Sequence, residues 1–508
     1  MSIGLNFETA GVNIKPTSRG EAKGVKNNAA EIATPIHITD GMVSLFDYTD
    51  YKKKIWMDIY CKSGNTIESL MKHGIKQNNI AAICPNRQCQ MLVSRKLYGY
   101  LPDEVEVEFN IESLRSYRVT RRRQIYFIEC VGGYAHAVKN NPSEIKCIIN
   151  NVIRKVMENT MSPEIDELRG RDMKPGKKFE INNIVMNPPY NPSDLYIDFV
   201  ELAHDIATDA VVAITPAKGI NGKADAKNDM FRKEIVPYIS KAVLSRSGHD
   251  IFDVDENAGI CYYLVDNRKH DVKLVKNICN DNKQIRSDFE EHDETSLNLY
   301  NRKILSIIGK VGTLGEGFKQ SLYVKNTDHG EETIAGTLGF KRQVFTGEQD
   351  RGVDTQQPNY VEVMQGEKVV GYRAVSELFT TLNLDKYKCT CSCMMGYSAM
   401  FLGKNKVIGS PYINVIGPNQ VPKGSFPVLK YFDTEQEAKS FQSYIHSKLC
   451  SFLFFLGICG ATITAQFFRF IPDPKVFDHI FTDDELYKKY GLTAEEINII
   501  ESVIKERK

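Results

Sequence analysis

Short apolar segments alternate with amphipathic ones through the first half of the chain. Residues 66–72 and 195–206 have helical periodicity, and in the second of these Phe199, Leu202 and Ile206 fall on one face. The segments between them are apolar, short and bounded by turn residues, which favours buried strands. The predicted strands are residues 55–60, 80–84, 124–131, 183–186, 210–214 and 259–265. This alternation predicts an α/β fold with a doubly wound, mostly parallel, Rossmann-like sheet.

The pattern changes after an acidic and polar segment at residues 279–295, which we predict to be a linker. Residues 296–475 lose the alternation and begin with glycine-rich turns, so we expect a separate α+β domain there. Residues 1–28 are polar and are expected to form a flexible arm. The first domain is therefore predicted to cover residues 29–295.

Residues 476–508 are predicted to form a helical tail. Thr482 with Glu485, and Thr493 with Glu496, have the spacing of capping boxes, in which two side chains pair with the first backbone amides of a helix.

The uncharged segment at residues 449–468 could form either a membrane span or a core helix. Its strongly apolar part, residues 452–458, is too short to cross about 30 Å of hydrocarbon. We therefore predict a buried helix that ends near Gly457, and no membrane span.

Composition narrows the class of protein only slightly. The chain has 508 residues with 65 Lys and Arg against 64 Asp and Glu, a formal net charge of +1. Apolar residues at 42% and charged residues at 25% are ordinary for a folded protein and exclude general disorder. Near-neutral charge excludes a protein that coats nucleic acid through bulk charge, but it leaves open a local basic groove. No secretory signal is visible, and the scattered cysteines make a reducing cytoplasm the expected location.

Neither the cysteines nor the charge clusters predict a metal site or a nuclease. Cys389, Cys391 and Cys393 lack the second ligand pair of a structural zinc site, and we interpret them as small residues on a buried strand face. Arginines at 115–123 either contact phosphates or pair with the acidic run at residues 103–108.

The strongest chemical signal is Asn187-Pro188-Pro189-Tyr190, directly after the predicted strand at 183–186. Open α/β sheets bind ligands at the carboxyl ends of their strands. The two prolines stiffen the backbone, so the Asn187 side-chain oxygen and the Pro188 carbonyl become two fixed acceptors. Such a pair can hold a planar amino group by both hydrogens and stabilise the positive charge that develops when its nitrogen attacks an electrophile. Tyr190 can stack on the attached ring.

With this motif the sequence resembles the S-adenosylmethionine-dependent adenine-specific DNA methyltransferases of restriction–modification systems. The segment at 31–37, with Thr34 and Pro35, resembles the family segment that lies against the methionine part of the cofactor. The segment at 57–65, with Asp58, Ser63 and Gly64, resembles the cofactor loop. The motif order, with a long region last, resembles the gamma arrangement.

The resemblance implies transfer of a methyl group from S-adenosylmethionine to the N6 amino group of adenine in double-stranded DNA. It implies catalysis by residues 187–190, stacking of Tyr190 and Phe252 on the target base, and a target-recognition domain at 296–475. A separate cognate restriction endonuclease is an expected partner. The alternatives are a protein glutamine methyltransferase, which acts on a similar planar amide, a cytosine-amino methylase, and a catalytically inactive DNA-binding specificity module.

Two positions depart from the family pattern. Lys62 replaces the first glycine of the cofactor loop, and the second strand is not followed by the acid that usually binds the ribose hydroxyls. Asn86 is the substitute that we expect to bind the ribose.

Overall fold

The chain forms two compact units, which are described separately below. The first unit comprises residues 1–217, 226–278 and 285–291, and the second comprises 218–225, 279–284 and 292–508. The computed structural model describes residues 33–46, 50–160, 179–220, 226–245, 252, 259–267, 274–278, 302–311, 338, 352–378, 383–394, 407–424, 426–458 and 462–507. The predicted arm at 1–28 and the predicted linker at 279–295 lie outside the described residues.

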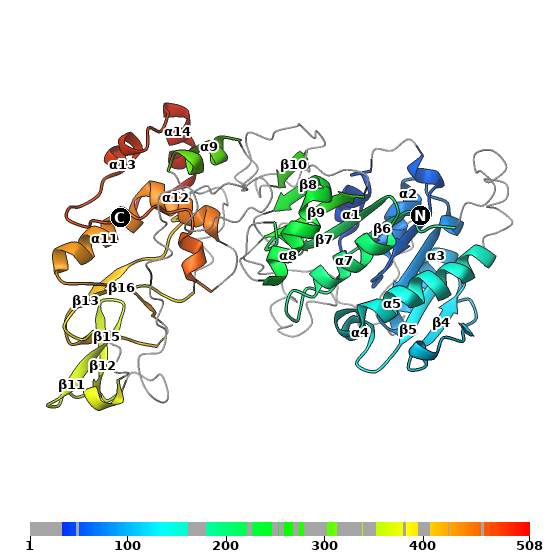
Figure 1. Ribbon diagram of the computed structural model, residues 1–508, viewed down its shortest axis with the longest axis horizontal. Coiled ribbons are helices and arrows are strands. Elements are labelled where there is room, and N and C mark those ends of the chain that lie inside the picture. The colour runs from blue at the N-terminus through cyan, green and yellow to red at the C-terminus, as the bar shows by residue number, and fades with distance from the viewer. Residues whose placement is uncertain are drawn as a thin grey trace. The chain divides into compact units, whose positions relative to one another are not determined.

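The first unit is built on one ten-stranded sheet with the order β10-β8-β9-β7-β6-β1-β2-β5-β4-β3 (Figure 1). In chain order the strands are β1 (Trp56–Asp58), β2 (Ile80–Cys84), β3 (Val105–Glu106), β4 (Arg118–Arg122), β5 (Ile125–Glu129), β6 (Asn183–Met186), β7 (Ala210–Pro216), β8 (Ile239–Ser245), β9 (Ile260–Asp266) and β10 (Leu274–Ile278).

The centre of this sheet is parallel and doubly wound, as predicted. β1 pairs in parallel with β2 on one side and with β6 on the other, and the parallel pairing continues to β5 and to β7. β9 runs antiparallel between β7 and β8, and β3 and β4 add an antiparallel edge. The chain therefore builds outward from β1 in one direction and then from β6 in the other, which makes the gap between β1 and β6 the topological switch point.

Helices cover both faces of the sheet. α1 (Ile36–Val43), α2 (Asn65–Lys72) and α3 (Arg87–Tyr98) share one hydrophobic core with strand residues such as Val185 and Val212. The helices drawn in front of the sheet in Figure 1 are α4 (Tyr134–Asn140), α5 (Pro142–Cys147), α7 (Tyr196–Ile206) and α8 (Ala226–Glu234). The shorter helical turns of this unit are Tyr51–Lys53, Gln77–Asn79, Glu112–Leu114, Ile148–Ile153 and Val236–Tyr238.

The second unit combines two small sheets with helices. One sheet has the order β12-β11-β15, and the other has the order β14-β13-β16. The strands are β11 (Tyr360–Gln365), β12 (Lys368–Ala374), β13 (Tyr387–Thr390), β14 (Asn414–Ile416), β15 (Gln420–Pro422) and β16 (Val428–Phe432). The helices are α9 (Arg302–Lys310), α11 (Glu435–His446), α12 (Lys448–Gly457), α13 (Asp483–Lys489) and α14 (Ala494–Val503), with short turns at Val375–Glu377 and Ala465–Phe468.

α12 is the buried helix expected from the uncharged segment. Every residue from Leu449 to Gly457 is buried, and the helix contacts α11, α13, α14 and the turn at Ala465–Phe468. A side chain at Gly457 would come within 2.3 Å of the Phe467 carbonyl oxygen, so glycine permits this close approach. Within the described residues, no helix has the length and apolar character that a membrane crossing needs.

The two predicted capping boxes differ in the structure. Thr493 and Glu496 form the reciprocal box at the start of α14. At α13 the Thr482 side chain accepts from the backbone N–H of Glu485, but the Glu485 carboxylate instead contacts Nε2 of His479 at 2.9 Å.

Candidate functional site

The loop after β1 and the Asn187 motif meet at one edge of the sheet. β1 and β6 are parallel neighbours, with Trp56 opposite Asn183 and Met57 opposite Ile184, so their carboxyl ends lie side by side. A small cavity opens there. It is lined by Thr34, Asp58, Tyr60, Lys62, Ser63, Gly64, Asn65, Thr66 and Asn187. The structure thus brings four of the predicted cofactor residues, Thr34, Asp58, Ser63 and Gly64, together with the predicted catalytic asparagine.

The side chain of Asn187 is held in a defined orientation. It is only 6% exposed, and its Nδ2 donates a hydrogen bond of 2.8 Å to Oγ1 of Thr34. Thr34 lies two residues before the start of α1. This bond uses the donor end of the amide, and it leaves the Oδ1 end as the acceptor. Pro188 and Pro189 are buried behind it, so the backbone that carries the amide is also fixed.

Thr34 is itself anchored by the first turn of α2. Asn65 donates from Nδ2 to the Thr34 carbonyl at 2.7 Å, and Lys96 on α3 donates to Oδ1 of Asn65 at 2.6 Å. A chain of hydrogen bonds therefore runs from α3 through α2 to the amide of Asn187. Sequence reasoning missed both Asn65 and Lys96. Asn65 could have been found as the residue that follows Ser-Gly in the loop, whereas Lys96 carries no local signal.

Asp58 forms hydrogen bonds that hold the loop after β1. Its carboxylate is buried, accepts a 2.9 Å hydrogen bond from the backbone N–H of Tyr60, and accepts a second bond from the Thr66 hydroxyl. Burial raises the pKa of Asp58 to about 6, against the opposing effect of these hydrogen bonds and of the nearby Lys62 charge. Through these two hydrogen bonds Asp58 holds the loop, and it also lines the cavity.

The loop ends where α2 begins, at Gly64. This residue has φ +76°, in the left-handed region, and an added Cβ would lie 3.2 Å from Cδ of Lys96. A side chain here would be strained in the backbone and crowded by α3. The loop was predicted to need small residues, and at Gly64 this need comes from the left-handed backbone conformation and the contact with α3.

Lys62 lines the cavity. It is only 8% exposed, and Nζ lies 5.6 Å from the centroid of the Tyr60 ring, which is a cation–π arrangement. The cavity has a volume of about 10 Å³, room for about one water molecule. The lining offers both signs of charge together with hydroxyl and amide groups, which suits a zwitterionic amino-acid ligand, but a ligand of that size fits only when lining side chains move.

Tyr190 and Phe252, the predicted pair for a target base, lie next to each other. Their ring centroids are 6.4 Å apart at an interplanar angle of 65°. Phe252 is 3% exposed and belongs to the core on the α1–α3 face, while Tyr190 is half-buried against that core. The two rings contact each other edge to face, and Tyr190 is the member of the pair that stays partly exposed.

Two further predicted cofactor residues do not line the cavity. Asn86 follows β2, is exposed, and caps α3 by accepting from the backbone N–H of Cys89 at 2.8 Å. Pro35 precedes α1, and its carbonyl accepts from the first amides of that helix, those of Ile38 and Thr39.

Two residues of the arginine cluster form ion pairs, and two of the three clustered cysteines are buried. Arg118 lies 2.8 Å from Glu106, and Arg122 lies 3.3 Å from Glu104, so two of the arginines pair with the acidic run. Cys389 and Cys391 are fully buried, although β13 ends between them at Thr390. Among the described residues, no group of three or more His, Cys, Asp or Glu side chains is arranged to hold a metal ion.

No protein-family model matches this chain, and no curated protein matches it. Solved structures with a similar fold include the methyltransferase subunit of a type I restriction–modification system from Streptococcus thermophilus. It is 10% identical, with a TM-score of 0.31 over 54% of this chain and 52% of that one. A modification subunit of a putative type I restriction enzyme from Vibrio vulnificus YJ016 is 12% identical, with a TM-score of 0.30 over 52% of this chain and 50% of that one.

The type IIL restriction–modification enzyme MmeI, solved in complex with DNA, is 10% identical, with a TM-score of 0.39 over 90% of this chain and 64% of that one. The chain spans about half the length of the first two structures. The fold itself is defined by the strand pairings of this chain, which form a mixed α/β unit with a large, mostly parallel sheet.

Proposed function

We propose that this chain transfers a methyl group from S-adenosylmethionine to the N6 amino group of adenine in a specific DNA sequence. The observation that carries the proposal is the oriented amide of Asn187, beside a loop cavity at the switch point between β1 and β6. This is where an open α/β sheet binds a small ligand next to a reacting group.

The residues of the motif have separate tasks in this reaction. Oδ1 of Asn187 and the carbonyl of Pro188 accept the two hydrogens of the target amino group, and they stabilise the positive charge that develops on its nitrogen. Tyr190 stacks on the base. The base must first leave the DNA stack, because its amino group is inaccessible within a duplex. The cofactor supplies an electrophilic methyl group on a sulfonium.

The loop residues hold the cofactor in this proposal. The small residues Ser63 and Gly64 let the loop backbone lie close to the cofactor, and Asn65 adds a polar group at the cavity wall. The cavity widens by movement of lining side chains, the buried Lys62 among them, before the cofactor enters. Asp58 keeps the loop in place and also lines the cavity beside the cofactor.

The proposal also covers the second unit, the DNA substrate and a partner enzyme. Residues 296–475 serve as a target-recognition domain, double-stranded DNA is the partner, and a separate endonuclease completes a restriction–modification pair. The near-neutral net charge of +1 is compatible with this setting, provided that the basic residues of the DNA-facing surface are balanced by acids elsewhere.

The test compares Asn187→Ala with Asn140→Ala, an exposed asparagine at the end of α4. Transfer of a tritiated methyl group to DNA should be lost in the first variant and kept in the second, with both folded by circular dichroism. Sequencing of the genome of a methylation-free host should show one adenine motif modified by the wild type only. Undiminished transfer by Asn187→Ala would sink the assignment.

One observation favours a second function, a DNA-binding module that has lost the cofactor. The cavity has a volume of only about 10 Å³, and the buried Lys62 is one of the side chains that line it. Isothermal titration of S-adenosylmethionine into the wild-type protein separates the two functions. Absence of binding, together with intact DNA binding, would support the module and exclude the enzyme.

A further inference from the structure

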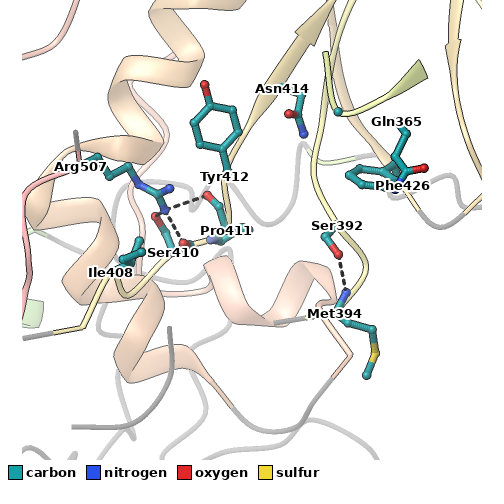
Figure 2. Close-up of a pocket in the computed structure, with 11 residues that line it drawn as sticks. Gln365, Ser392, Met394, Ile408, Ser410, Pro411, Tyr412, Asn414, Phe426 and Arg507 are labelled. Carbon is teal, nitrogen blue, oxygen red and sulfur yellow. Dashed lines mark hydrogen bonds between the residues drawn. The ribbon is translucent and has the colours of Figure 1, made fainter. Parts of the chain in front are cut away.

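The second unit contains a larger pocket that the proposed reaction does not use. Its volume is about 460 Å³, within the usual range of small-molecule sites. The pocket lies where the turn after β11, the segment after β13, the segment before β14 and the C-terminal Arg507 come together (Figure 2).

The segment that leads into β14 is held rigidly from behind. The backbone N–H of Ile413 donates to Nε2 of His446 at 2.9 Å, and Gln442 donates to the Ile413 carbonyl at 2.6 Å. Arg507 donates to the carbonyl of Pro411 at 3.0 Å and also to that of Ser410. Tyr412, within this pinned segment, is nevertheless 52% exposed. A rigid backbone with an exposed aromatic ring is a preorganised contact surface.

Aromatic and amide groups face the pocket from different sides. Figure 2 shows Tyr412 on one side, Phe426 and Gln365 on the other, and Asn414 between them. Asn414 is 6% exposed and is anchored through Nδ2 to the Thr390 carbonyl at 3.4 Å, whereas Gln365 is exposed. A primary amide presents a donor and an acceptor side by side, the pattern found on the edges of the nucleobases.

The charge of the lining narrows the class of ligand. Arg507 is the only charged side chain among the described residues that line the pocket, and no carboxylate lines it. The guanidinium lies 5.9 Å from the Tyr412 ring centroid and makes the aromatic wall mildly positive. This lining suits a flat, neutral ring attached to an anionic group, and it disfavours cations.

We propose that this pocket binds a single unstacked purine or pyrimidine base, with Tyr412 and Phe426 against its faces and Gln365 and Asn414 at its edge. The base comes either from a free nucleotide or from a DNA strand. The proposal does not rest on methyl transfer, because it concerns residues of the second unit alone.

Photo-crosslinking of the full-length protein locates the base. The probes are 5-iodo-deoxyuridine monophosphate and a single-stranded oligonucleotide that carries one 5-iodo-deoxyuridine. Mass spectrometry should find the adduct on peptides that contain Tyr412, Phe426 or Met394. Adducts from the oligonucleotide only would identify a strand as the source, and adducts from both probes would identify a nucleotide pocket. Adducts only elsewhere, or none, would overturn the proposal.

Binding of the same oligonucleotide tests the roles of the side chains. Tyr412→Ala should weaken the affinity about 10-fold, the usual effect of losing one stacked base, whereas Tyr412→Phe should retain it. Gln365→Ala should also weaken it, while the exposed Gln357→Ala, outside the pocket, is the matched control. If an oligonucleotide with an abasic site in place of the modified base competes as well as the intact strand, the pocket binds backbone or another ligand, and the proposal fails.

Discussion

The side-chain amide of Asn187 donates a hydrogen bond of 2.8 Å to Oγ1 of Thr34, a residue 153 positions earlier in the chain. The family resemblance implies that Thr34 lies against the cofactor, but its hydroxyl contacts the amide that we propose as catalytic. Thr34 is therefore a positioning residue for Asn187 in the proposed reaction. The Thr34 carbonyl accepts a hydrogen bond from Asn65, and this bond keeps the Thr34 hydroxyl in place beside Asn187.

Thr34→Val should slow methyl transfer without preventing cofactor binding. The variant keeps the branched shape at a buried site but removes the acceptor of Asn187 Nδ2, so the amide is free to rotate. We expect kcat to fall about 10-fold, the usual consequence of losing a buried hydrogen-bond partner, with the Kd for S-adenosylmethionine little changed. Thr34→Ser should retain activity. Wild-type kcat in Thr34→Val would show that the hydrogen bond does not position the amide.

Asp58→Ala should destabilise the first unit by about 3 kcal/mol. The substitution leaves the buried N–H of Tyr60 and the hydroxyl of Thr66 without their carboxylate acceptor, and each such loss costs about 1–3 kcal/mol. The single tryptophan of the chain, Trp56, is fully buried on β1, so its fluorescence during urea unfolding reports on this unit. Asp103→Ala, at an exposed position, is the control and should unfold like the wild type. Equal midpoints for all three proteins would contradict this role for Asp58.

Lys62→Ala should increase the affinity for S-adenosylmethionine. The buried Lys62 side chain is part of the lining, and the cavity, with a volume of about 10 Å³, must widen before a ligand enters. A lower Kd by isothermal titration, with the exposed Lys139→Ala on α4 as a lysine control that should leave the Kd unchanged, would confirm this obstruction. Weaker binding in Lys62→Ala would instead indicate that the ammonium pairs with the ligand.

His446→Gln should make the second unit less sensitive to acid. Burial, with a smaller effect of the Arg507 charge, lowers the pKa of His446 from 6.5 to about 3, so the folded imidazole stays neutral and accepts from Ile413. Between pH 6.5 and 3 the unfolded chain binds a proton that the folded chain does not, and stability is lost as the pH falls.

From pH 6.5 to 5 this loss amounts to about 2 kcal/mol at about 1.4 kcal/mol per pKa unit. Glutamine can still accept from Ile413 but does not titrate, so its unfolding free energy, followed by circular dichroism, should change less over this range. Parallel pH profiles for the two proteins would exclude His446 as the titrating group.

The sheet centre could be predicted because its strands are uniformly apolar. β2 and β6 begin and end at the predicted residues, and β1, β5, β7 and β9 lie within two residues of the predicted limits. β4 and β8 were missed because Arg118–Arg122 is rich in arginine and Ile239–Ser245 includes Ser240 and Lys241. Both strands have a neighbour on each side, and this pairing, rather than apolar character, decides their conformation.

The site was predictable only in part, for a related reason. Asn187 and the loop after β1 have local patterns, and the parallel pairing of β1 with β6 brings them together. The links through Asn65 and Lys96 depend on how α2 and α3 pack, which no local pattern encodes. The same applies to Asn86, whose oxygen caps a helix that the periodicity did not reveal.

The burial of α12 determines when the second unit can fold. This helix is enclosed by α11 before it and by α13 and α14 after it, and the ammonium of Lys448 pairs with Glu501 at 2.6 Å. During synthesis the apolar α12 leaves the ribosome before α13 and α14, two of the helices that cover it. The described strands of the first unit are complete by Ile278, whereas the second unit closes its core only after Val503. The interval between them exposes an aggregation-prone surface, so we expect slow elongation or chaperone contact to matter for the second unit and not for the first.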